Sequence, residues 1–253
     1  MNVFNLIIFV LVLISGISGC SFDKAGQFVK NPFGGDFLLE LKNKLKKQRS
    51  VNDVIETYGP RARKVMKAHF KKAKVAYPPE ELVLIGLKNE EKLLIYARDK
   101  DDDFVKITEY AILGSSGVAG PKLKQGDCQM PEGFYRINAF NPNSSYHLSL
   151  RVNYPNEEDR AHALKDKRKK LGGDIMIHGK NVSIGCLAMG DEPIEEIFTL
   201  VYDTGRDSTR VILAPCDLTV KKPIIDMKTQ PDWLPGLYKR LKAELNLYFK
   251  GQS

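Results

Sequence analysis

Short runs rich in β-branched, aliphatic and aromatic residues recur between residues 82 and 215, and this series constrains the fold more than any other feature. Polar turns containing charged residues, Gly, Pro or Asn separate many of the runs, which span 82–87, 92–98, 104–113, 133–140, 146–154, 174–179 and 210–215. Runs of this length and composition are typical of β-strands. Seven of them in succession predict a β-sandwich or barrel-like domain.

Helical patterns accompany these runs and extend beyond both of their ends. Apolar residues recur at helical spacing in four places: 51–58, 62–73, 192–202 and from Pro235 toward the C-terminus. Gly59 and Pro60 predict a break between the first two stretches. The highly charged segment 156–170 is expected to be an exposed loop or a short helix. The predicted class is therefore mainly β (α+β), a sandwich with N-terminal and C-terminal helices.

The N-terminus reads as an export signal that ends in a lipidation site. Residues 6–14 are wholly apolar, a length that suits a signal peptide and is too short to span a bilayer. The following "ISGC" resembles a bacterial lipobox, so Cys20 is expected to become the lipidated first residue. Ser21, where Asp would favour the inner membrane, resembles outer-membrane sorting. An uncleaved anchor, or secretory cleavage with Cys20 incidental, are the alternatives.

The net charge of +8 favours an anionic neighbour. Nucleic acid, lipid headgroups and an anionic polymer all fit a basic chain. Export from the cytoplasm argues against nucleic acid, which leaves a wall polymer or a membrane reached through the lipid anchor. We therefore expect an exported, periplasmic protein that is lipid-anchored, in the outer membrane of a Gram-negative bacterium.

Three cysteines remain after Cys20, and one of them lies in a segment with reactive character. Cys128 and Cys216 could pair, although nothing in the sequence demonstrates it, and an odd number leaves at least one free thiol or an intermolecular pair. Cys186 follows a glycine in "IMIHGKNVSIGCLAMGD", which also holds His178. A cysteine nucleophile needs a base and oxyanion donors, and the backbone N–H groups of "SIGC" could supply the latter. A helix beginning near Asp191 is expected to favour the thiolate if Cys186 lies at its N-terminus.

Residues of the same segment could also support two other types of chemistry. His178, Cys186 and His147 could bind a metal, but no C-x-x-C or H-x-x-x-H spacing occurs, so no metal is expected. Ser183 could act as a hydrolase nucleophile, but "SIGC" lacks the G-x-S-x-G pattern. A hydrogen-bonded structural role is the expected one for His147.

Three segments together resemble one family. "GPKLKQGDCQMPEGFYRI", "NPNSSYHLSLRVNYPN" and "IMIHGKNVSIGCLAMGD" follow the order seen in L,D-transpeptidases with the YkuD-type catalytic domain, and are most similar to the short-loop branch related to YafK. The resemblance spans roughly residues 77–219. It implies a β-sandwich with a cysteine active site that attacks meso-diaminopimelate in peptidoglycan stem peptides and forms a thioester. It implies no metal or organic cofactor.

The resemblance assigns roles to individual residues. Cys186 matches the nucleophile, His178 the base, Gly179 the residue whose backbone oxygen orients that base, and Gly185 the glycine before the nucleophile. Ser183 opens the matching motif and is assigned to substrate binding.

Two departures from the family pattern affect substrate recognition. Ile184 replaces the motif's histidine, and Ala188 stands where longer-loop members have an arginine that is thought to bind a stem-peptide carboxylate. Arg160 is the first candidate to replace that arginine, followed by Arg151 and Lys122, because a guanidinium fork suits a carboxylate.

The expected organisation is a signal peptide (1–20), a tether (21–36), a helical segment (37–77), the catalytic domain (78–220) and a C-terminal helical segment (221–253). The expected activity is acyl transfer to an amine in cell wall organisation. One alternative is hydrolysis at the same site that releases a peptidoglycan-linked lipoprotein, and another is a non-catalytic wall-binding lipoprotein.

Overall fold

The computed structural model describes residues 48–249, and residues from Arg49 onward form one compact unit. The predicted signal peptide, the tether, the lipidation site at Cys20 and the beginning of the 37–77 segment lie outside the described residues.

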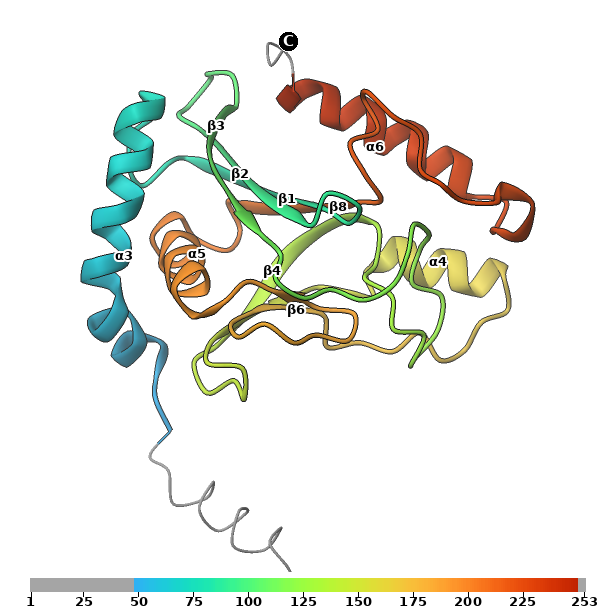
Figure 1. The fold of residues 1–253 in the computed structure, drawn as a ribbon, viewed down its shortest axis with the longest axis horizontal. Coiled ribbons are helices and arrows are strands. Elements are labelled where there is room, and N and C mark those ends of the chain that lie inside the picture. Colours follow the sequence, from blue (N-terminus) through green and yellow to red (C-terminus); the bar gives the residue numbers. More distant parts are fainter. Residues whose placement is uncertain (1–47, 250–253) are drawn as a thin grey trace, which may run out of the picture. The chain divides into compact units, whose positions relative to one another are not determined.

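One sheet of eight strands forms the centre of the domain (Figure 1). Its order is β3-β2-β1-β8-β4-β5-β6-β7, and the strands are β1 (Glu81–Leu87), β2 (Lys92–Arg98), β3 (Val105–Ala111), β4 (Gly133–Asn141), β5 (Ser149–Val152), β6 (Met176–His178), β7 (Leu187–Ala188) and β8 (Thr209–Ala214). Each of the seven predicted runs contains one strand. The eighth, β7, has two residues and gave no pattern in the sequence.

The helices are α3 (Val51–Ala73), α4 (Glu157–Lys165), α5 (Asp191–Thr204) and α6 (Leu234–Phe249), with a short 3-10 helix at Met227–Thr229. Within the charged 156–170 segment, α4 is therefore the short helix that was one of the two expectations. None of the helices among residues 48–249 is both long and apolar enough to cross a membrane.

Strand β4 joins two halves of the sheet. Its first residues, Gly133–Arg136, pair with β8, whereas Ile137–Asn141 pair with β5, and the register shifts between Ile137 and Ala139. A single core unites inward side chains of both halves with α5, among them Leu84 of β1 and Leu150 of β5. The predicted class, α+β with helices at both ends of the domain, is confirmed.

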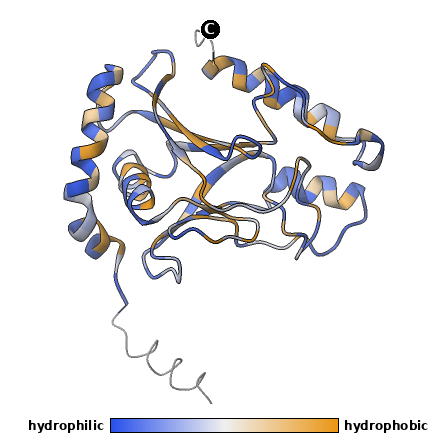
Figure 2. Ribbon diagram, in the orientation of Figure 1, coloured by the Kyte–Doolittle hydropathy of each residue, from blue (hydrophilic) through white to orange (hydrophobic). Residues whose placement is uncertain are grey.

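Strand β1 explains why residues 82–87 read as a continuous apolar run. Leu82 and Leu84 enter the core shared with α5, whereas Val83 and Ile85 enter a second core beneath α6. Successive side chains of a strand point to opposite faces, so a strand covered on both faces needs apolar residues at every position. Figure 2 shows this apolar character along the central strands and on the inner faces of the helices.

Helix α3 runs through Gly59 and Pro60 without interruption, so the predicted break is wrong. Proline removes one backbone hydrogen bond from a helix, but buried residues on both sides of Pro60, such as Ile55 and Met66, lie in the core shared with α5, and the helix continues. Tertiary contacts of this kind commonly override local propensity. Ion pairs between the two helices support the packing: Arg61 with Glu195 and Glu196, and Arg63 with Asp203.

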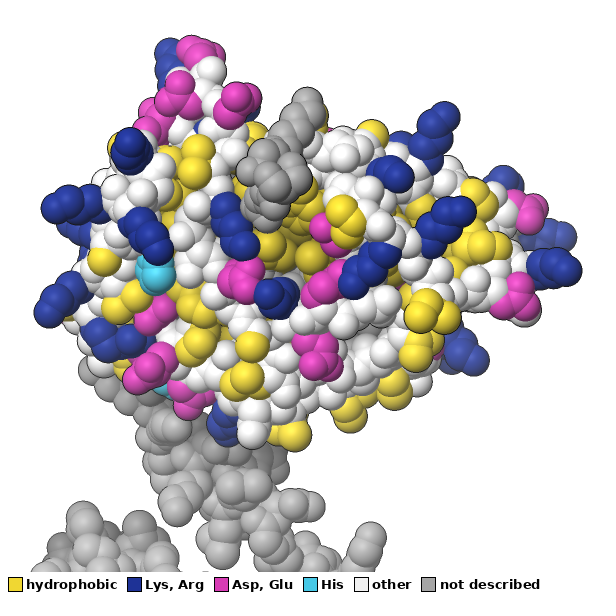
Figure 3. Space-filling view, turned by 45° about the horizontal axis from the view of Figure 1, so that its top comes forward, with side chains coloured by type: hydrophobic (Ala, Val, Ile, Leu, Met, Phe, Trp, Pro, Cys, Tyr) yellow, Lys and Arg dark blue, Asp and Glu magenta, His cyan; other side chains and the backbone are white. Residues whose placement is uncertain are grey.

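The surface charge is dispersed on the face shown in Figure 3. Lys and Arg side chains alternate there with Asp and Glu, and apolar side chains lie between them. The net charge of +8 is therefore not gathered into one basic patch on that face.

Candidate active site

The edge formed by β5, β6 and β7 brings the predicted histidine and cysteine together. Strands β6 and β7 are parallel, with His178 opposite Ala188, so the loop after His178 returns the chain to the start of β7. Cys186 immediately precedes β7, and the N–H of Met176 donates a hydrogen bond to its Sγ at 3.4 Å. His178 and Cys186 thus line one pocket of about 470 Å³.

The hydrogen bond of His178 fixes its tautomer. His178 is 3% exposed, and its Nδ1 lies 2.6 Å from the carbonyl oxygen of Gly179. A carbonyl only accepts, so Nδ1 carries the proton and Nε2 of the neutral ring keeps its lone pair. Burial lowers the pKa of His178, and the Gly179 carbonyl partly opposes that shift. The structure thus places Gly179 where the predicted orienting carbonyl belongs.

Glycine is required at position 179 by its neighbours. A Cβ there would lie 2.7 Å from Oδ1 of Asp191 and 2.7 Å from the carbonyl oxygen of Tyr146. Asp191 also accepts a hydrogen bond from the N–H of Lys180 at 2.8 Å. These contacts hold the segment after His178 against the beginning of α5.

Cys186 carries a thiol that the surrounding protein keeps protonated. Burial raises its pKa, while hydrogen bonds with the N–H of Met176 and with Ser183 oppose the rise. The Sγ–H donates to the carbonyl oxygen of Asp174 at 3.5 Å. Burial thus outweighs the stabilising contacts of the sulfur. That α5 favours the thiolate if Cys186 lies at its N-terminus stays a prediction.

The two N–H groups suited to an oxyanion are already bonded to serine hydroxyls. Gly185 donates to Oγ of Ser116 at 2.6 Å, and Cys186 donates to Oγ of Ser183 at 2.9 Å. Ser116 in turn donates to the carbonyl oxygen of Cys128 at 2.7 Å. Ser116 thus connects the loop that contains Cys186 to the segment before β4. A substrate carbonyl must displace one or both hydroxyls to reach these donors.

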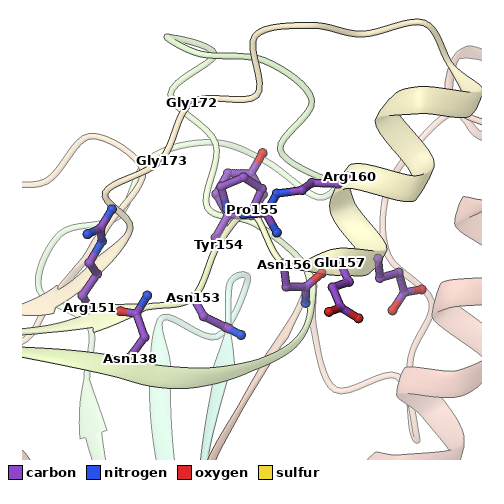
Figure 4. Close-up of a pocket in the computed structure, with 11 residues that line it drawn as sticks. Asn138, Arg151, Asn153, Tyr154, Pro155, Asn156, Glu157, Arg160, Gly172 and Gly173 are labelled. Carbon is purple, nitrogen blue, oxygen red and sulfur yellow. The ribbon is translucent and has the colours of Figure 1, made fainter.

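Arg151 and Arg160 line a second pocket, of about 770 Å³ (Figure 4). Arg151 comes from β5 and Arg160 from α4, and Tyr154 and Pro155 lie between them. Arg151 pairs with Asp174 at 3.0 Å, and Asp174 also lines the pocket of Cys186. This ion pair is where the two pockets meet.

Lys122 is placed differently from the other predicted substrate ligands. It is buried and lines neither of these two pockets, and its Nζ pairs with Asp127 at 2.6 Å and donates to the carbonyl oxygen of Lys124. The geometry therefore gives Lys122 a structural partner rather than an open position for a carboxylate.

Several residues of the Cys186 pocket could not be recognised from the sequence alone. Tyr146 covers His178, with their ring centroids 4.6 Å apart, and Asn141, Ser149 and Asp174 complete polar parts of the wall. A hint was present for Tyr146, because it adjoins His147 in a predicted strand. Nothing in the sequence indicated the face on which Ser149 lies.

The structure also locates His147, Cys128 and Cys216, which were considered from the sequence. Nε2 of His147 lies 2.8 Å from Glu195, which confirms its hydrogen-bonded role. Cys128 is exposed, Cys216 is buried, and both are free thiols. Within residues 48–249, no group of three or more His, Cys, Asp or Glu side chains is arranged to hold a metal ion.

An α+β domain with a curled sheet and a cysteine–histidine pocket at one sheet edge defines the class of this protein. Residues 81–213 match the L,D-transpeptidase catalytic domain, YkuD, and this range is more than half of the chain. The chain belongs to that family, which confirms the resemblance seen in the three motifs.

The chain is also similar to named members. It is 37% identical over 142 residues to the Escherichia coli strain K12 protein named "Putative L,D-transpeptidase YafK", with 54% of this chain and 55% of YafK covered. The chain therefore spans about half the length of the curated relatives it matches.

Two solved structures are similar at lower identity. The helical cell shape determining protein Pgp2 of Campylobacter jejuni gives a TM-score of 0.46 at 24% identity, covering 58% of this chain and 50% of Pgp2. L,D-transpeptidase 1 of Mycobacterium tuberculosis gives a TM-score of 0.30 at 12% identity, covering 53% and 62% respectively.

Proposed function

We propose that the protein is a cysteine acyltransferase of the L,D-transpeptidase type that acts on meso-diaminopimelate-containing stem peptides of peptidoglycan. The observation that carries this proposal is the shared pocket of Cys186 and His178, in which the Gly179 carbonyl leaves Nε2 of His178 free as a base. Membership of the YkuD family supports the reaction type. The role of the protein would then be in cell wall organisation.

In the first half-reaction, Nε2 of His178 takes the Sγ–H proton as Cys186 attacks the carbonyl at the L-centre of meso-diaminopimelate. The N–H groups of Gly185 and Cys186 donate to the oxyanion once the serine hydroxyls are displaced. His178 then returns its proton to the leaving amine of the terminal residue as the C–N bond breaks. A thioester on Cys186 and a free amino acid result.

In the second half-reaction, an acceptor amine attacks the thioester, and His178 accepts its proton and passes it to the departing sulfur. Because thiol and imidazole are both neutral at the start, the cycle returns to the same protonation state. No group outside the pocket and the two substrates is needed for the balance of protons.

Arg160 and Arg151 are proposed to bind a carboxylate of the stem peptide in the adjoining pocket. Both guanidinium groups face a polar cavity, and a guanidinium forms paired hydrogen bonds with a carboxylate. Arg151 would have to exchange its partner Asp174 for the substrate, whereas Arg160 forms no ion pair within the described part of the chain. Arg160 is therefore the first ligand to test.

A carbapenem tests the nucleophile directly, because it acylates an activated cysteine and adds its mass to the protein. We expect one adduct on the wild-type chain and none on Cys186→Ser, measured by intact-protein mass spectrometry. Cys128→Ser should be acylated like the wild type, because Cys128 lies outside the pocket wall. An adduct that persists on Cys186→Ser would contradict the assignment. No adduct on the wild type would favour a non-catalytic wall-binding role.

The acceptor decides between transfer and the alternative of hydrolysis. Incubation with a disaccharide tetrapeptide, and separately with a protein-linked muropeptide, gives different products in the two cases. A 3-3 cross-linked dimer indicates an amine acceptor. Release of the linked protein with free tripeptide ends indicates water, and a function in detaching lipoprotein from the wall.

We also propose that the chain is exported and anchored by a lipid at Cys20 on the periplasmic side of the outer membrane. The apolar run 6–14 and the "ISGC" sequence support this. Labelling cells with a palmitate analogue should mark the wild type and not Cys20→Ser. Equal labelling of both chains would exclude lipidation at this cysteine.

A further inference from the structure

The wall of the catalytic pocket contains a buried hydroxyl without a partner. Ser149 is 1% exposed, and its Oγ has no hydrogen-bond partner. Among residues 48–249, two other buried side-chain oxygens share this condition, on Glu90 and Thr204, and neither residue lines the pocket of Cys186. An unpaired buried hydroxyl costs free energy, so folded proteins rarely retain one without a reason.

The strand register places Ser149 at the centre of a row of pocket residues. On one side it lies opposite Asn141 of β4, and on the other side it lies opposite His178 of β6. Residues directly opposite each other on neighbouring strands project to the same face of a sheet. All three line the Cys186 pocket, so the row crosses its wall beside the reacting groups.

The same face of β5 continues into the second pocket. Side chains two residues apart on a strand share a face, which puts Arg151 on the side of Ser149. Arg151 lines the adjoining pocket and pairs with Asp174 at the boundary. A peptide that enters both pockets therefore passes Ser149 close to the reacting carbonyl and reaches Arg151 about 7 Å further along the strand.

The neighbours of Ser149 do not provide its missing partner. Oγ of Ser149 forms no hydrogen bond with any side chain of the pocket wall, Nε2 of His178 included. We propose that Ser149 is a substrate-binding residue whose hydroxyl hydrogen-bonds an amide group of the stem peptide next to the attacked carbonyl. This inference deepens the proposed function and rests on it for the identity of the peptide.

Binding measured without chemistry separates this role from catalysis. In the full chain with Cys186→Ala, a disaccharide tetrapeptide containing meso-diaminopimelate is titrated by calorimetry, with and without Ser149→Ala. Loss of one hydrogen bond to the ligand should raise the Kd about three- to tenfold. Thr204→Val is the matched control, because it removes the other unpartnered hydroxyl at a site outside the pocket, and it should leave the Kd unchanged.

Stability provides an independent readout. Because neither hydroxyl has a partner in the folded chain, Ser149→Ala and Thr204→Val should both leave the melting temperature unchanged or raise it. A lower melting temperature for Ser149→Ala alone would mean that the hydroxyl is bonded inside the folded protein, and would overturn the inference. An equal Kd for the two chains, or no measurable binding to Cys186→Ala, would also overturn it.

Turnover distinguishes this inference from the proposed function. With Cys186 present, Ser149→Ala should raise KM and leave kcat and its pH profile unchanged. A lower kcat with a shifted pH profile and constant KM would mean that Ser149 acts through His178 rather than by binding the substrate. If the wild type binds the tetrapeptide through Ser149 but leaves it intact, the proposed reaction fails and the binding role stands. If the wild type turns over the peptide and Ser149→Ala does so with the same KM, the proposed reaction stands and the binding role of Ser149 fails.

Discussion

The two ends of the sheet are built in different ways. Strands β1, β2 and β8 have six or seven residues each, pair over their whole length and are covered on both faces. Strands β5, β6 and β7 have two to four residues, and these strands together with the loops between them carry the candidate chemistry. Both ends bury apolar side chains, among them Leu150 and Ile177 at the second, but the second also depends on backbone positions set by glycines and hydroxyls.

The difference shows how the fold separates stability from function. Removing apolar contacts at the central strands should affect unfolding without touching the pocket. Changing the β6–β7 loop should affect the reaction while leaving most of the core in place. Four predictions test this separation.

His178→Ala at the short-stranded end should lower the rate of acylation by a carbapenem about 10²- to 10⁴-fold, because the thiol loses its general base. Denaturant unfolding should change little, since the core beneath α6 is untouched. His162→Ala is the control, because His162 stacks on Trp233 outside the pocket. A rate within threefold of wild type for His178→Ala, about 0.6 kcal/mol in activation free energy, would remove His178 from the mechanism.

Ile85→Ala in β1, at the end of the sheet with long strands, should lower the free energy of unfolding by about 2–5 kcal/mol, because it opens a cavity in the core beneath α6. Leu247→Ala, at an exposed position of α6, should cost much less. Urea unfolding measures both, and acylation per folded molecule should match wild type in each. A specific loss of activity in Ile85→Ala would show that the two ends are coupled.

Gly185→Ala should slow acylation about 10- to 100-fold, because a small displacement of Cys186 is enough to misplace the nucleophile. Gly185 has φ +85°, and a Cβ would lie 3.1 Å from the carbonyl oxygen of Gln129. Gly126→Ala is the matched control, with φ +76° and open space around the new Cβ. Both variants should lose about 1–2 kcal/mol of stability, but only Gly185→Ala should lose activity.

The smallest expected effect is that of pH near neutrality. The reactive form contains a neutral imidazole and a thiol, and burial lowers the pKa of His178 while it raises that of Cys186. The rate should fall with acid only below about pH 6.5, where His178 is protonated. Between pH 7 and 8, the acylation rate should therefore change less than about twofold. A tenfold rise in the acylation rate between pH 7 and 8 would mean that the Cys186 thiol itself titrates in this range.

The sequence predicted the long, two-sided strands best. The apolar run at 82–87 and the charged turns around it allow few alternatives, and the strand boundaries differ from the predicted ones by one residue. The same local reasoning failed at Gly59 and Pro60, because the packing that carries α3 past them comes from α5, more than a hundred residues away.

The candidate site was predictable only in part. The motif order pointed to His178 and Cys186, and their shared pocket agrees with that prediction. Ser149 could not be found, because its place depends on the register between three strands. From the sequence, Lys122 was a candidate to bind a substrate carboxylate. Its ion pair with Asp127 depends on a turn in which Asp127 accepts hydrogen bonds from backbone N–H groups, and sequence periodicity does not predict such a turn.

The short connection between β6 and β7 has a consequence for rearranging the chain. His178, Gly179 and Cys186 all belong to one contiguous segment of nine residues. Circular permutation that opens the turn between β1 and β2, near Asn89, would leave this segment unbroken. The reaction centre could then be moved along the linear order of the gene without being divided, provided that β5 still pairs beside it.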